Sequence, residues 1–148
     1  MTEARTFKYR TNLARKMSAP GGVSIADAVS RADAGLEQHR TAAMAALVDC
    51  VAALEASCAA QSPGSERGVY DRAAALLDMA GFFDTGPLYK AAFSLCELAD
   101  RLIETGAWNW PSITVHVRAL RLILADDCRD TEQAGLILEG LSAILRRF

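Results

Sequence analysis

Few side chains in this chain of 148 residues are of a type that could do chemistry. Its two histidines are His39 and His116, and each has an arginine within two residues. An imidazole nitrogen can take up a phosphoryl group, and a nearby cation stabilises the charge that arrives with it. Each histidine is therefore a candidate phosphoacceptor. The spacing of the apolar neighbours places both at the partly exposed edge of an apolar helix face, where most histidines are structural.

The remaining polar residues give no catalytic pattern. Ser94 has no histidine and acid at a spacing that can be read from the sequence. Asp126 and Asp127 are predicted to lie at a solvated helix end, whereas a pair of carboxylates needs burial to separate its pKa values for acid–base work. The sequence thus predicts a protein that is not an enzyme and has no catalytic residue.

The four cysteines are Cys50, Cys58, Cys96 and Cys128. They form no CxxC pair and have no histidine at the spacing of a zinc site, so we expect reduced thiols and neither metal nor cofactor. Reduced thiols indicate the cytoplasm. The N-terminus has no apolar core of a signal peptide, and we expect no window with the ~18 apolar residues of a membrane span. The predicted location is cytoplasmic, without membrane insertion.

The composition and the net charge indicate the secondary structure of the chain and one class of partner that it does not bind. Apolar residues make up 51% of the chain, with much Ala and Leu, and no stretch alternates β-branched and aromatic residues as a strand would. The net charge of -2 gives no general attraction to nucleic acid. We therefore predict an all-α protein that does not bind nucleic acid.

The first 22 residues are predicted to form a basic, flexible arm that ends in the breaker Ala19-Pro20-Gly21-Gly22. A helical bundle domain follows over residues 23–148. Its first helix starts at Ser24, a hydroxyl cap with Asp27 three residues later, and runs to about Gln61. The core stripe of this helix is predicted to be Leu36, Ala43, Leu47, Cys50, Leu54 and Cys58.

A helical hairpin is predicted next, from about Glu66 to Phe83 and from Pro87 to Gly106, with Thr85 as the cap of its second helix. The expected outward face of the first helix carries Asp71, Ala74, Asp78 and Phe82. Two further helices follow, from Pro111 to about Ala125 and from Asp130 or Thr131 onward, the last with an apolar stripe that includes Leu136. Short connections favour an antiparallel up-and-down four-helix bundle with an extra C-terminal helix.

The stretch AGFFDTGPLYKAAFSLCE, residues 80–97, resembles the second half of the motif in histidine phosphotransfer (HPt) domains. The resemblance implies an HPt-like four-helix bundle that meets receiver domains of response regulators, or histidine kinases, through its second and third helices. In that motif the phosphoacceptor histidine falls on Ala74, a lysine on Leu77 and a glycine on Asp78. The nucleophile and the cation are thus both replaced.

The resemblance therefore implies a non-catalytic adaptor in two-component or chemotaxis signalling. Its partner-binding surface would be formed by Ala74, Leu77, Asp78 and Phe82. With APGG before a long helix, and SLCEL followed later by WNWP, the chain is also similar, more weakly, to CheE-like chemotaxis proteins of alphaproteobacteria. Two alternatives remain open: a histidine phosphotransfer protein that uses His39 or His116, and a structural homodimer that exchanges the arm and the start of the long helix.

Overall fold

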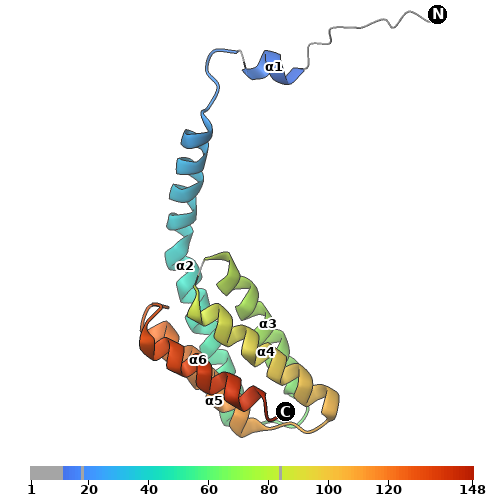
Figure 1. Ribbon diagram of the computed structural model, residues 1–148. Coiled ribbons are helices and arrows are strands. Elements are labelled where there is room, and N and C mark those ends of the chain that lie inside the picture. The colour runs from blue at the N-terminus through green and yellow to red at the C-terminus, as the bar shows by residue number, and fades with distance from the viewer. Residues whose placement is uncertain (1–11, 18, 84) are drawn as a thin grey trace, which may run out of the picture. The chain divides into compact units, whose positions relative to one another are not determined.

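The computed structural model describes residues 12–17, 19–83 and 85–148, so most of the predicted basic arm lies outside the described residues. The described part is all-α and contains no strand, which confirms the predicted fold class at this level. The chain divides into two compact units, Met1–His39 and Arg40–Phe148, and the division falls inside a helix. Figure 1 labels the six helices of the described residues: α1 (Asn12–Met17), α2 (Ile25–Ala60), α3 (Glu66–Phe82), α4 (Pro87–Thr105), α5 (Trp110–Ala125) and α6 (Glu132–Leu145).

The first unit holds α1 and the start of α2. The predicted cap of α2 is confirmed, because the Ser24 hydroxyl accepts a hydrogen bond from the Asp27 amide at 3.0 Å and donates one to the Asp27 carboxylate at 2.8 Å. Leu36, predicted to be a core residue, is instead 45% exposed. The helical spacing between Leu36 and Leu47 predicted one continuous buried stripe, but the buried residues of α2 begin only at Leu47.

The second unit is built around α4, which contacts α3, α5 and α6. In Figure 1, α3 runs beside α4, and α5 and α6 lie together. Seven leucines and alanines of α4 are buried, and the three alanines among them let neighbouring helices approach closely. These buried residues are Leu88, Ala91, Ala92, Leu95, Leu98, Ala99 and Leu102. Gly106 ends the helix in the left-handed conformation, with φ 65°, as predicted.

The two last helices begin at side-chain caps. Asn109 accepts a hydrogen bond from the Ser112 amide at 2.9 Å at the start of α5, and Thr131 accepts one from the Ala134 amide at 3.2 Å at the start of α6. Leu136 was expected to lie in the apolar stripe with which α6 packs, but its side chain is 63% exposed. Only Leu141 and Ala134 of α6 are buried, and the helix contacts α4 and α5.

A tryptophan pair links α4 and α5. The rings of Trp108 and Trp110 meet edge to face with centroids 5.4 Å apart, and both pack against the core, as expected for residues that close the end of a bundle.

One described helix, α2, is long and apolar enough to cross a membrane by length and composition alone. An 18-residue window in it has a mean hydropathy of 1.6, with 22% of the window buried inside the protein. The expectation from the sequence concerned an unbroken run of ~18 apolar residues, and Asp49 and Glu55 interrupt such a run in α2. The alanines of α2 nevertheless keep its mean hydropathy high.

Replacement of Leu95 by Ala should lower the free energy of unfolding by about 2–5 kcal/mol, because the fully buried side chain leaves a cavity where α4 meets its neighbours. Chemical denaturation monitored by circular dichroism measures the change. Leu36→Ala, at an exposed leucine, is the matched control and should stay within about 0.5 kcal/mol of the parent protein. Equal effects of the two variants would contradict the assigned core.

Candidate functional site

The four residues predicted to bind a partner all lie on α3, with different exposures. Phe82 is 73% exposed and Asp78 is also exposed. Ala74 is half-buried on the same side of the helix, four residues before Asp78. Leu77 is half-buried and packs against the core. The exposed part of the predicted surface therefore consists of Asp78 and Phe82.

Helix α4 adds two aromatic residues that the sequence analysis did not single out. Tyr89 and Phe93 are both exposed and lie one turn apart. The Tyr89 ring lies against Gly81 of α3, because a Cβ atom at Gly81 would come within 3.3 Å of Tyr89 Cε2. The i, i+4 spacing of two aromatics outside the leucine stripe was the signal available in the sequence. We name Asp78, Gly81, Phe82, Tyr89 and Phe93 the α3–α4 face.

Phe82 is the most exposed aromatic residue of the α3–α4 face. Its ring is tilted by 51° to the ring of Phe83, with centroids 5.9 Å apart, and it remains 73% exposed within the described structure. Clustering of exposed aromatic rings on one face is typical of a surface that binds another molecule.

The Asp78 carboxylate of the α3–α4 face lies near the Cys96 thiol and affects its pKa. Burial, and then the nearby Asp78 carboxylate, raise the pKa of the Cys96 thiol on α4 to about 11. A thiol with this pKa stays protonated at neutral pH and is a poor nucleophile. Cys96 therefore gives this region no reactive group.

The turn that joins α3 to α4 is fixed by a buried threonine. The Thr85 hydroxyl donates a hydrogen bond to the Ala80 carbonyl at 2.9 Å, and the Thr85 carbonyl accepts one from the Leu88 amide at 2.9 Å. Thr85 was predicted to cap α4 with its side chain, which is wrong, because its hydroxyl satisfies the end of α3 instead. Gly86 follows with φ 36°, a conformation that disfavours other residues.

His116 was predicted to be partly exposed, and the structure corrects this. Its side chain has 0% exposure on α5. Nδ1 lies 2.9 Å from the Ser112 carbonyl oxygen, and Nε2 lies 3.1 Å from the Ser94 hydroxyl of α4. Because a carbonyl oxygen only accepts, Nδ1 carries the proton and Nε2 of the neutral ring accepts from Ser94. Ser94 and His116 are 22 positions apart in the chain, so local spacing in the sequence does not show that they are partners.

This Ser94–His116 pair has the atoms of a nucleophile and a base, but its surroundings favour a structural role. The imidazole is sealed from solvent. Its contact with Ser94 joins α5 to α4, and with both ring nitrogens paired His116 is a satisfied buried polar group. His39 lies exposed on α2 in the first unit, so of the two histidines it alone presents its ring to solvent.

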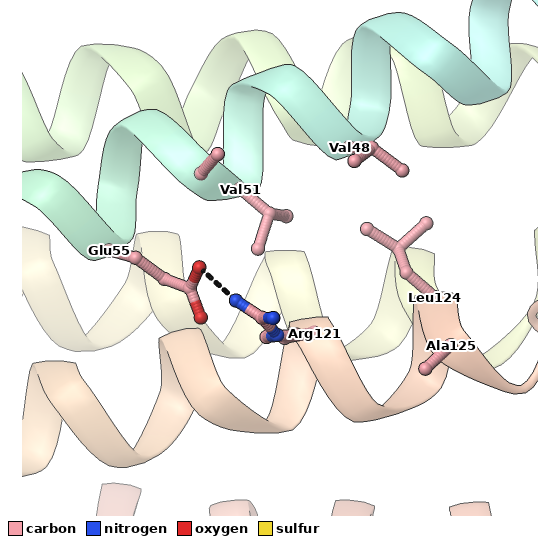
Figure 2. A pocket seen from close by; sticks show the side chains of 7 residues that line it. Val48, Val51, Glu55, Arg121, Leu124 and Ala125 are labelled. Carbon is pink, nitrogen blue, oxygen red and sulfur yellow. Dashed lines mark hydrogen bonds and ion pairs between the residues drawn. The ribbon is translucent and has the colours of Figure 1, made fainter.

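A half-open hollow lies between the later part of α2 and α5, with a volume of about 260 Å³ (Figure 2). Val48, Val51 and Leu124 supply apolar walls. Its two charged residues face each other, since Arg121 donates a hydrogen bond to the Glu55 carboxylate at 2.7 Å. The pair satisfies its own charges, so the hollow has no free charge with which to orient a ligand.

Replacement of Thr85 by Val should destabilise the protein by about 1–3 kcal/mol, because the isosteric side chain leaves the Ala80 carbonyl without its buried donor. Thermal and chemical unfolding measure the loss. Thr85→Ser retains the hydroxyl and is the control, with a smaller loss expected. If Thr85→Val were as stable as the parent, the hydrogen bond would have no structural importance.

The pKa of His116 is lowered, first by burial and against the smaller opposing effect of the Ser112 carbonyl. The unfolded chain therefore binds a proton at a higher pH than the folded chain does. The free energy of unfolding should be at its full value above about pH 6.5 and fall as the pH decreases below it, by at most about 1.4 kcal/mol per pH unit.

Urea unfolding between pH 5 and 7.5 tests this effect. His116→Gln should flatten the pH dependence in this window, because it removes the titrating group. His39→Gln is the control for the loss of an imidazole at an exposed position and should keep the parent slope. A slope that persists in His116→Gln would assign the effect to another residue.

No family model, no functionally characterised protein and no solved structure matches this chain. A proposal for its function therefore has to rest on the residues, the contacts and the surfaces described above.

Proposed function

We propose that the protein is a non-catalytic signalling adaptor that binds the receiver domain of a response regulator, or a histidine kinase, through its α3–α4 face. The proposal rests on the exposure of Phe82 on α3 and of Tyr89 and Phe93 on α4, with the Tyr89 ring against Gly81, the residue before Phe82. An exposed aromatic cluster costs solubility, and burial in a complex recovers about 1.5–3 kcal/mol for each large side chain.

The helix contacts support an HPt-like arrangement of the second unit. Helix α4 contacts α3 and α5. The later part of α2 reaches α3 where Cys50 Sγ lies 3.5 Å from the Arg72 carbonyl oxygen, and it reaches α5 through the Glu55–Arg121 pair. Four helices in which each contacts two others are expected of a four-helix bundle, with α6 as the additional helix. The up-and-down order of the bundle is part of the proposal.

The proposed binding mode needs no phosphoryl transfer. Where the resemblance places the phosphoacceptor, Ala74 offers only a methyl group, and the Asp78 carboxylate one turn later would repel a phosphate. A receiver domain could therefore dock on the face without losing its phosphoryl group to it. We propose that docking competes with true phosphotransfer partners or holds the receiver near them, in the cytoplasm where these domains act.

Titration of the full chain against receiver domains, followed by calorimetry, tests the proposal. Phe82→Ala should weaken binding at least tenfold, because it removes the most exposed ring of the face. Ala74→Glu should also weaken it, since a longer charged side chain would stand beside Asp78. Phe148→Ala removes an exposed phenylalanine outside the face and is the matched control, with unchanged affinity expected.

Two results would contradict the adaptor. The first is binding that both face variants leave unchanged. The second is transfer of an acid-labile phosphoryl label from a phosphorylated receiver to the chain, which would indicate the alternative of a phosphotransfer protein. Because His116 is sealed inside the bundle, loss of such a label in His39→Ala would identify His39 as the acceptor.

A further inference from the structure

An apolar groove runs between α5 and α6, on residues separate from those of the α3–α4 face. The two helices contact each other, and the groove between them has a volume of about 300 Å³. Its lining is almost wholly apolar and includes Val115, Ala119, Leu122, Leu136, Gly140 and Ile144.

The walls of this groove are exposed aliphatic side chains. Val115 is 44% exposed, Leu122 56% and Leu136 63%. Between them, Ala119 and Gly140 leave room, and a Cβ atom added at Gly140 would meet nothing within 4 Å. Large residues at the rim and small ones at the floor form a shape into which the ridge of another helix can pack.

The two sides of the groove differ in charge. On the α5 side, the exposed Arg118 belongs to the lining. On the α6 side, Glu132 and Glu139 are exposed about one turn before and after Leu136. The groove thus has a basic edge on α5 and an acidic edge on α6.

We propose that this groove is the interface of a homodimer, in which a second copy packs its own α5–α6 groove against the first. A two-fold axis that runs along the groove brings α5 of each copy against α6 of the other. The basic edge of one copy then meets the acidic edge of its partner, twice in each dimer. An axis across the groove would instead set Arg118 against its own copy, which like-charge repulsion disfavours.

The exposed leucines define the packing. The ridge that carries Leu136 in one copy enters the groove beside Leu122 of the other, and the same contact occurs twice in the symmetric pair. The α3–α4 face takes no part in this contact. The dimer therefore offers two copies of that face, although the inference itself depends only on α5 and α6.

Sedimentation equilibrium of the full chain over a range of concentrations tests the proposal. The parent protein should be dimeric, and Leu122→Glu should raise the dimer dissociation constant at least tenfold because it places a carboxylate in the apolar groove. Leu36→Glu is the matched control at another exposed leucine, on α2, and should leave the dimer intact. A parent protein that stays monomeric overturns the proposal. So does a dimer that Leu36→Glu dissociates and Leu122→Glu does not.

Charge exchange tests the geometry without a change in the apolar surface. Arg118→Glu and Glu139→Arg should each weaken the dimer severalfold, and the double variant should regain most of the lost affinity. In addition, Leu122→Cys mixed with Leu136→Cys should form a disulfide-linked dimer under mild oxidation, and the yield should exceed that of Leu122→Cys alone. Preferential linkage of Leu122→Cys to itself would overturn the proposed axis.

Discussion

The structure of the second unit depends on the packing of α4, whose neighbours are α3, α5 and α6. Its leucines and alanines are sealed from solvent, so every element that bears a candidate surface is held by contact with this one helix, directly or through a neighbour. The alanines matter as much as the leucines, because small side chains allow helices to approach closely while the leucines fill the space between them. The buried area of α4 thereby fixes where α3 presents Phe82 and where α5 and α6 leave their groove.

Two buried polar residues give this packing its register. Thr85 ends α3 and starts the turn into α4, and His116 joins α5 to α4 through Ser94. Each is fully satisfied, so neither carries the cost of an unpaired polar group, and each would lose a partner if a helix slid by a turn. Trp108 differs from these two residues. Its indole nitrogen is the one buried side-chain donor or acceptor of the described residues that has no hydrogen-bond partner.

The two apolar surfaces of the second unit suit different partners. The α3–α4 face, the proposed surface for a protein of another kind, is aromatic and carries the Asp78 carboxylate. The α5–α6 groove, the proposed contact with a second copy, is aliphatic with a basic and an acidic edge. An adaptor with both surfaces could hold two signalling proteins at a fixed separation. That arrangement would give bivalent binding without any catalytic residue.

Sequence periodicity alone determined the helices of the second unit and most of their inner faces, because each of these helices buries one continuous stripe. The apolar stripe of α4, the end of that helix at Gly106 and the cap at Ser24 follow from local rules of spacing and capping. Tertiary structure decided the rest. His116 pairs with Ser94, which is distant in the chain, and Leu36 and Leu136 are exposed although their spacing continues an apolar stripe. Periodicity shows which side of a helix is apolar, but only the arrangement of the other helices decides how far along that side the burial extends.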